Sequence, residues 1–446
     1  MPVGVVLPMK RSSLSLRLAA PAAALVLAGL TATACAPSTS SNSESTKDSK
    51  SGTIRVWLFR EVNNAPKEKV VKEAVAEFTK KHSDTRVDVT YIPIETRAEK
   101  MKAAFNDPKS APDAVEFGNT DTAGYVNDGG LADITAEFGK WGDAKSVTAS
   151  VKEAVSVGGK VYGVPWYVGV RALYYRTDIF KELGLKPPAT QGELATAARR
   201  IRAEHPDMFG ISVGAKNVYG MLPFLWSAGG DLAEKRGDTY TAAIDSAASR
   251  KGLKTYTDLI AKDSCPPQQC AELGGDAGVQ TFAGGKAGMA IGGDFSRQAM
   301  EDGAVKGKYA VVPLPGPEKG VISPAFAGGN NLGVMRGTTH RTLAVDFVEL
   351  LGGAAYQSKM FDAMGNMPAL TDVQEKVAEK APFTKPFVDT LKSGTKFVPV
   401  TPAWSKIDSE AMIPTMMQEI VSGRKSVDAA TADAAKKMDA AFSSAG

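Results

Sequence analysis

Short apolar runs and amphipathic stretches alternate between residues 53 and 117. Thr53–Phe59 has the pattern of a strand, Arg86–Ile92 alternates apolar and polar positions, and a shorter strand-like run covers Asp113–Phe117. The stretches 66–82 and 99–107 lie between them and have the pattern of helices, the first opening on a proline. This order predicts a parallel sheet covered by helices. The apolar face of the first helix consists of Val70, Val71, Ala74, Val75 and Phe78.

Two loops follow strands of this predicted sheet. In parallel α/β sheets, ligands bind outside the carboxyl ends of the strands. We therefore expect the loops Leu58–Asn64 and Phe117–Tyr125 to line a site.

The rest of the chain mixes the same two patterns without an internal repeat. Val161–Tyr175 is strand-like, and Thr190 with Glu193 three residues later predicts a capping box at the start of a helix. A long helical pattern over 338–364 is broken at Gly352-Gly353. Further strands are expected at 208–214, 287–295 and 308–316, and further helices at 221–231, 252–262, 277–285, 295–302 and over most of the chain from 405.

The N-terminus has the three-part layout of a secretory signal peptide. Lys10, Arg11 and Arg17 precede the apolar run 18–30, which small residues follow. That run is shorter than the roughly 20 apolar residues of a membrane-spanning helix. We expect residues 1–34 to be a signal peptide.

Cys35 ends this leader. Ala32-Thr33-Ala34-Cys35 resembles a bacterial lipobox, in which the cysteine becomes the lipid-modified first residue, although Ala32 stands where a large aliphatic residue is usual. An ordinary cleaved signal with an incidental cysteine is the alternative. Residues 36–52 are almost wholly polar and predict disorder. Segment 35–52 is therefore expected to be a lipid-anchored, disordered tether.

Composition narrows the class of the remaining chain. About 395 residues suit two domains, and 43% hydrophobic with 23% charged residues is typical of a globular protein. The leader holds three of the 53 basic residues and none of the 49 acidic ones, so the rest is nearly neutral. This balance gives no electrostatic case for binding nucleic acid.

The other two cysteines, Cys265 and Cys270, lie five positions apart beside two prolines, which predicts a loop. A disulfide is the expected state in an oxidising compartment. A metal site is the alternative, but the other histidines and cysteines lie far away in the sequence.

Five segments in order resemble the extracellular solute-binding proteins of ABC sugar importers, the group that includes maltose-binding protein. They read PDAVEFGNTDTAGYVNDGGLADI, VYGVPWYVGVRALYYRTDIF, LWSAGGDL, AGMAIGGDF and PAFAGGNNLGV. The resemblance implies an α/β fold of the type II periplasmic-binding-protein class, with two lobes and a hinge that the chain crosses more than once. It places the first lobe at 53–165 plus about 326–372, and the second at 166–325 plus about 373–446.

The same resemblance implies a function. We expect a protein that captures a sugar or oligosaccharide between its lobes and delivers it to the membrane permease, without catalysis, cofactor or metal. A monomer held at the outer face of the bacterial membrane by its lipid anchor alone is expected.

Sugar sites combine flat aromatic side chains with a few fixed polar groups. Arg171 additionally leaves an acidic sugar open as the ligand. For each tryptophan the alternative is core packing, and for each Asn or Asp it is a turn or cap. The candidates are Trp57, Asn63, Asn119, Asp121, Trp166, Tyr167, Arg171, Trp226, Asp294, Phe295, Asn330 and Trp404.

Particular residues suggest three alternative functions, namely a serine hydrolase, a glycosidase and a ferric-ion-binding protein. GISVG at 210–214 fits the G-x-S-x-G pattern of serine hydrolases, with His340 as the single later histidine. A glycosidase would need two opposed carboxylates. Tyr174-Tyr175 resembles the adjacent tyrosines of ferric-ion-binding relatives of this fold, although neighbours in a strand point to opposite faces.

Overall fold

The computed structural model describes residues 48–61, 63–93, 96–107, 110–237 and 239–444. The predicted signal peptide 1–34, Cys35 and most of the predicted tether lie outside these ranges. No helix in the described ranges is both long and apolar enough to cross a membrane.

The end of the predicted tether is ordered rather than free. The Asp48 carboxylate accepts hydrogen bonds from the backbone N–H and the hydroxyl of Thr342, at 3.1 and 2.6 Å. The Ser49 N–H donates to the Thr339 carbonyl at 2.7 Å. The prediction of disorder up to residue 52 is therefore wrong for 48–52, because these polar groups find partners on the folded body and Gly52 already begins a strand.

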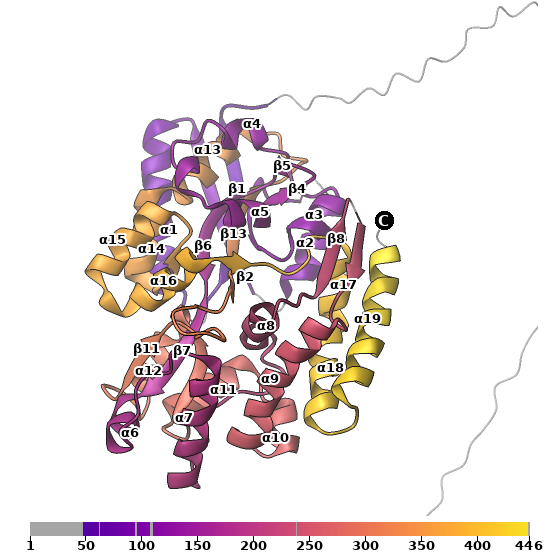
Figure 1. Cartoon of the computed structure of the whole chain (residues 1–446). Helices are drawn as coiled ribbons and strands as arrows, with labels where there is room; N and C mark the ends of the chain where they lie inside the picture. The colour runs from indigo at the N-terminus through magenta and orange to yellow at the C-terminus, as the bar shows by residue number, and fades with distance from the viewer. Residues whose placement is uncertain (1–47, 62, 94–95, 108–109, 238, 445–446) are drawn as a thin grey trace, which may run out of the picture. The chain divides into compact units, whose positions relative to one another are not determined.

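The first lobe is built on a six-stranded sheet in the order β14-β6-β13-β3-β1-β2. Figure 1 labels β1, β2, β6 and β13 of this sheet. β1 pairs in parallel with β2 and β3, as predicted, whereas β13 runs antiparallel to β3 and β6, so the sheet is mixed. Its strands are β1 (Gly52–Arg60), β2 (Thr85–Pro93), β3 (Ala114–Gly118), β6 (Val164–Gly169), β13 (Gly328–Val334) and β14 (Met367–Pro368).

Helices cover both faces of this sheet. Ile54, Val56 and Leu58 of β1 pack into a core with α1, α13 and α14, while Trp57 lies on the opposite face with α2. The helices of this lobe are α1 (Ala65–Lys81), α2 (Arg97–Asn106), α3 (Thr122–Asn127), α4 (Thr135–Phe138), α5 (Ala149–Ala154), α13 (Arg341–Leu351) and α14 (Ala354–Met364). A small hairpin joins β4 (Ser156–Val157) to β5 (Lys160–Val161).

The second lobe has a three-stranded antiparallel sheet in the order β10-β7-β11. Its strands are β7 (Arg171–Arg176), β10 (Met289–Gly293) and β11 (Tyr309–Val312). A separate hairpin pairs β8 (Ala233–Arg236) with β9 (Thr239–Ala242). The predicted strand over 208–214 forms only isolated bridges, from Phe209 to Ala287 and from Ser212 to Ala290.

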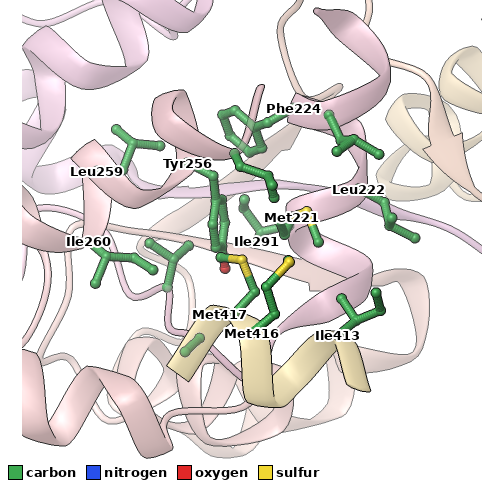
Figure 2. Packing of buried hydrophobic residues seen from close by; sticks show 14 of the residues in the cluster. Met221, Leu222, Phe224, Tyr256, Leu259, Ile260, Ile291, Ile413, Met416 and Met417 are labelled. Atoms are coloured by element: carbon green, nitrogen blue, oxygen red, sulfur yellow. The ribbon is translucent and has the colours of Figure 1, made fainter. Parts of the chain in front are cut away.

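Helices from the middle and the end of the chain form most of this lobe. They are α6 (Thr177–Glu182), α7 (Gln191–Glu204), α8 (Val218–Ser227), α9 (Ala247–Asp263), α10 (Pro267–Glu272), α11 (Gly275–Ala283), α12 (Arg297–Asp302), α17 (Ala403–Ser409), α18 (Met412–Val421) and α19 (Val427–Ser444). Figure 2 shows their common core, where Phe224 of α8, Tyr256 of α9 and Met416 and Met417 of α18 meet. Distant parts of the sequence therefore share one core.

The chain crosses between the lobes three times. Val170 separates β6 of the first sheet from β7 of the second, and Ala327 separates β12 (Ala325–Phe326) from β13. The third crossing follows α15 (Thr371–Lys380), which packs on β14, and precedes α16 (Lys385–Ser393), which packs on β7 and β11. The first and third crossings thus lie some residues beyond the predicted lobe boundaries at 165 and 372. β15 (Thr395–Lys396) then pairs with β12.

Two local predictions have clear outcomes. The Thr190 hydroxyl accepts a hydrogen bond from the Glu193 N–H at 3.1 Å, which confirms Thr190 as the cap of α7. Cys265 and Cys270 form a disulfide, but the segment between them is not the predicted loop throughout. It contains the first turn of α10 (Pro267–Glu272), which continues beyond Cys270. Pro267 occupies the first helical position, where its missing N–H costs nothing.

Candidate functional site

A cavity of about 460 Å³ lies between the two lobes. The first lobe contributes the loops after β1 and β3, the end of β6 and the start of β13. The second lobe contributes β7, α8 and the segment after β10. Both loops predicted to line a site reach this cavity. Its walls consist of Phe59, Glu61, Arg97, Gly118, Asn119, Thr120, Asp121, Tyr167, Val168, Gly169, Arg171, Tyr219, Asp294, Phe295, Phe326, Gly328, Gly329, Asn330 and Asn366.

A buried ion pair lies behind the first-lobe wall. The Lys67 ammonium on α1 donates to the carboxylates of Glu116 and Glu61 and to the Phe59 carbonyl, each at 2.9 Å. The side chains of Lys67 and Glu116 are fully buried, whereas Glu61 reaches the cavity. Burial lowers the pKa of Lys67, but Glu116 and Glu61 outweigh it, so the pKa is raised and the lysine stays charged.

Glu116 also holds two side chains of the cavity wall. Its Oε1 accepts the Tyr167 hydroxyl at 2.9 Å and the Asn330 amide at 2.6 Å. The Asn330 amide donates to the Tyr167 oxygen as well, at 2.6 Å. Burial and then Glu116 raise the pKa of Tyr167 well above its usual value, so its proton stays in place.

Asn119 and Asp121 come from the loop after β3. The Asn119 amide donates to the Ala327 carbonyl at 2.6 Å, which ties this loop to the second crossing. Burial raises the pKa of Asp121 to about 6, although nearby Arg97 lowers it. The Asp121 carboxyl is therefore mostly ionised at neutral pH, with a minor protonated fraction.

Gly329 makes the close packing of this wall possible. Its φ of +125° is strained for any residue with a side chain, and a Cβ atom would lie 2.1 Å from the Tyr167 carbonyl oxygen. The glycine therefore lets β13 approach β6 closely at the edge of the cavity that Gly329 also lines.

The second-lobe wall is aromatic and cationic. The Arg171 guanidinium lies 5.2 Å from the Tyr219 ring centroid and 5.8 Å from that of Phe295. The Tyr219 ring stacks on Phe326 at 4.4 Å. Phe295 is half exposed, unlike almost every other large hydrophobic side chain in the described ranges.

Asp294 joins the two lobes at the hinge. Its carboxylate accepts the Val170 N–H at 3.0 Å, at the first crossing, and the Met367 N–H of β14 at 3.4 Å. Burial raises its pKa to about 7, against the opposing effect of these hydrogen bonds and of Arg171. The hinge thus contains a carboxyl group that titrates near neutrality.

Seven of the twelve predicted site residues line this cavity, and five do not. The seven are Asn119, Asp121, Tyr167, Arg171, Asp294, Phe295 and Asn330. The five that lie elsewhere among the described residues are Trp57, Asn63, Trp166, Trp226 and Trp404.

Trp166 is the most important correction. Its side chain is fully buried in the first-lobe core, with Lys67 5.1 Å from its ring. β6 stays in the first sheet up to Gly169, and successive side chains of a strand alternate, so Tyr167 rather than Trp166 faces the cavity.

The other tryptophans also pack against protein. Trp226 and Trp404 are almost wholly buried in the second-lobe core, and the Trp226 indole donates to Asp231 at 3.0 Å. Trp57 packs with α2, where Lys100 lies 6.0 Å from its ring. Asn63 is exposed beyond the part of its loop that reaches the cavity.

Several wall residues were not predicted. Phe59 and Glu61 lie within a loop that was expected to line a site, so their position in the sequence could have identified them. Arg97, Tyr219, Phe326 and Asn366 carry no such signal. The elements that hold them are α2, α8, the second crossing and the loop between α14 and β14, and these reach the cavity only through the tertiary fold.

The residues of the alternative serine hydrolase and ferric-ion sites do not come together in the structure. Ser212 is buried in the second lobe, whereas His340 lies in the first lobe 3.4 Å from Asp113, so they cannot form a hydrolase site. Tyr174 donates to the Gly293 carbonyl at 2.7 Å inside one core, while the Tyr175 ring packs at a tilt against Phe180 in another. The ferric-ion site through this pair is therefore wrong. Within the described ranges, no three His, Cys, Asp or Glu side chains cluster as a metal site would require.

Comparisons with known proteins agree with this architecture. The family model of the bacterial extracellular solute-binding proteins matches residues 64–358. The diacetylchitobiose binding protein DasA of Streptomyces coelicolor is 27% identical over 360 residues, covering 77% of this chain and 79% of that protein. The multiple sugar-binding protein of Streptococcus mutans is 25% identical over 373 residues, covering 81% and 85%.

Solved structures share the fold. The sugar-binding protein MalE of Xanthomonas citri superposes with a TM-score of 0.77 at 23% identity, covering 88% of this chain and 98% of that one. A solute binding protein of Thermotoga lettingae, solved with α-D-tagatose, gives a TM-score of 0.72 at 24% identity, covering 88% and 100%. The chain has the two-lobed α/β fold of these binding proteins.

Proposed function

Because the chain belongs to the bacterial extracellular solute-binding protein family, we propose that it captures a sugar or oligosaccharide between its lobes and delivers it to the permease of an ABC importer. The family consists of solute-binding proteins, and we propose that the chain has no catalytic activity of its own. The relatives named for diacetylchitobiose and for multiple sugars favour a carbohydrate ligand.

One observation in the cavity supports this proposal most directly. The Phe295 side chain is 50% exposed on one wall, and carboxylates and amides held by buried hydrogen bonds stand on the other. An exposed aromatic ring is costly to leave in water and can cover the apolar face of a sugar ring. Fixed polar groups can then bind its hydroxyl groups.

The delivery step depends on where the protein is held. We propose that residues 1–34 are removed, that Cys35 is lipidated and that the chain acts as a monomer at the outer face of the membrane. One acyl chain anchors only weakly, so we expect more than one. A Cys35→Ala protein should be released or left unprocessed; a processed Cys35→Ala protein that stays on the membrane contradicts the lipid anchor.

A binding screen tests the proposed ligand class. Purified protein is melted alone and with maltose, maltotetraose, lactose, diacetylchitobiose, glucuronic acid and inorganic phosphate. A ligand at 100 times its dissociation constant adds about 2.7 kcal/mol to the free energy of unfolding, so a neutral sugar should raise the melting temperature clearly. A panel in which no sugar changes the melting curve contradicts the proposal.

An acidic sugar is the second candidate, and Arg171 is the residue that favours it. Among the described residues its guanidinium contacts two aromatic rings but forms no ion pair with a carboxylate. A shift with glucuronic acid that exceeds those of the neutral sugars would select this candidate.

A further inference from the structure

The buried pair behind the first-lobe wall uses all of its hydrogen-bonding capacity. An ammonium group has three protons, and those of Lys67 go to Glu116, Glu61 and the Phe59 carbonyl. Glu116 accepts four donors, from Lys67, the Phe59 N–H, Tyr167 and Asn330. An ionised carboxylate can only accept, so this arrangement determines the direction of every bond that it makes.

That direction fixes what two wall residues present to the cavity. Tyr167 has a single hydroxyl proton, which it donates to Glu116. The Asn330 NH₂ group has two protons and lies 2.6 Å from both Glu116 and the Tyr167 oxygen. With both protons used, Asn330 is left with its carbonyl oxygen and Tyr167 with a lone pair, and both of these are acceptors.

Asn119 and Glu61 extend the same surface. The Asn119 NH₂ group donates to the Ala327 carbonyl, which orients its side-chain oxygen the other way. Glu61 uses Oε1 on Lys67. No described residue donates a hydrogen bond to Asn119 Oδ1, Asn330 Oδ1 or Glu61 Oε2, so three acceptors remain for a ligand.

We propose that Glu116 and Lys67 are positioning residues that make one part of the first-lobe wall, formed by Glu61, Asn119, Tyr167 and Asn330, a surface of hydrogen-bond acceptors. This surface selects a ligand edge that carries several free hydroxyl donors. The inference rests on the proposed sugar-binding function and specifies which edge of the sugar the site accepts. Neighbouring free hydroxyl groups satisfy such a wall, whereas an ether oxygen, an acyl carbonyl or a carboxylate placed there leaves buried acceptors unpaired. The guanidinium donors that reach the cavity are Arg97 of α2, in the first lobe, and Arg171 on the opposite wall.

Analogue binding to the unaltered protein gives the first test. Maltose, lactose and diacetylchitobiose are compared by calorimetry with their mono-deoxy and mono-O-methyl forms, one hydroxyl at a time. We expect a contiguous set of two or more positions at which either change weakens binding about tenfold or more, as the loss of a hydrogen bond to a charged or fixed acceptor would. Losses spread evenly over all positions, or below about twofold everywhere, would overturn the inference.

Glu116→Gln tests the role of the buried pair. Glutamine has one acceptor oxygen in place of two, and its other end is an NH₂ group that can only donate. Tyr167 and Asn330 donate to one oxygen of Glu116, while Lys67 and the Phe59 N–H donate to the other, so in the variant one of these two pairs of donors must face the NH₂ group. Discrimination here is the affinity for the parent sugar divided by the affinity for its deoxy or O-methyl analogue. We expect this ratio to fall at least about threefold in Glu116→Gln. This readout concerns the ratio of two affinities, which a general loss of stability does not change.

Asp113→Asn is the matched control. Asp113 is another buried carboxylate at the same end of the chain, and it accepts the Arg55 N–H of β1 at 2.7 Å, as Glu116 accepts the Phe59 N–H at 2.7 Å. It does not line the cavity between the lobes. Asp113→Asn should lower stability and leave the discrimination unchanged; equal changes in both variants would overturn the positioning role.

The outcomes separate the two proposals. If no sugar binds the unaltered protein, the proposed function fails and this inference falls with it. If a sugar binds but its hydroxyls can be blocked without loss, the function stands and the inference alone fails. If Glu116→Gln does not fold, the analogue series on the unaltered protein still tests whether the site selects free hydroxyl groups.

Discussion

The two walls of the cavity are built from different chemistry. On the first-lobe wall, Glu61 and Asn330 are held by a fully buried ion pair and its hydrogen bonds. On the second-lobe wall, Arg171 lies close to the rings of both Tyr219 and Phe295, and Phe295 is half exposed. A rigid polar wall can fix the orientation of a ligand, whereas an exposed aromatic wall gains most of its contact when the lobes close.

The largest effect is expected behind the first wall, at Trp166. Trp166→Ala should lower the free energy of unfolding by about 3–5 kcal/mol even without ligand, because it leaves a cavity in a closed core. Denaturant unfolding measures this. If the variant has normal stability but no longer binds sugar, Trp166 contacts the ligand and its assignment to the core is wrong.

Lys67→Met should have nearly as large an effect. It leaves Glu116 buried without its cation, and removal of one partner of a buried pair costs about 3–5 kcal/mol. The matched control is Lys359→Met, since the Lys359–Glu73 pair is exposed and worth about 0–1 kcal/mol. Equal unfolding free energies for the two variants would contradict the role assigned to the buried pair.

The hinge carboxyl should make stability depend on pH. Burial raises the pKa of Asp294 to about 7 in the folded protein, above its ordinary value near 3.8, so the folded state binds more protons than the unfolded state between these values. Stability must then fall as pH rises, by about 2–3 kcal/mol between pH 5 and 7.5.

Asp294→Asn isolates this contribution. It removes the titrating group while other groups, such as Glu349 with a pKa raised to about 7, remain in both proteins. The decline of stability with pH should therefore be shallower in the variant. Parallel curves from urea unfolding across this pH range would show that Asp294 does not titrate there.

The smallest effect is expected on the second wall. Phe295→Ala should weaken sugar binding by about 1–2 kcal/mol, or roughly 5- to 30-fold, through lost contact with the ring. Its stability should change little, because the side chain is half exposed. Val321→Ala is the matched control, an equally exposed apolar residue at 46% outside the cavity. If the two variants bind sugar with equal affinity, Phe295 does not contact the sugar.

Local patterns were enough to predict much of the fold. The spacing of Val70, Val71 and Phe78 predicted α1, and the alternation over 86–92 predicted β2, because these periods reflect which side chains face a core. The glycine pair at 352–353 correctly predicted the break between α13 and α14. The loops after β1 and β3 were predicted to line a site because ligands bind at the carboxyl ends of the strands in a parallel sheet, and both loops reach the cavity.

The tertiary structure decided the rest, because it depends on contacts between distant parts of the chain. Whether Trp166 or Tyr167 faces the cavity follows from which sheet β6 joins and how far, and a strand pattern shows alternation without showing which face is buried. The direction of the Asn330 amide depends on Glu116, which lies 214 positions earlier. The sequence alone thus indicated the two-lobed class and the loops that line the cavity. The hydrogen-bonding polarity of the cavity wall arose only when α1, β3, β6 and β13 came together around one buried ion pair.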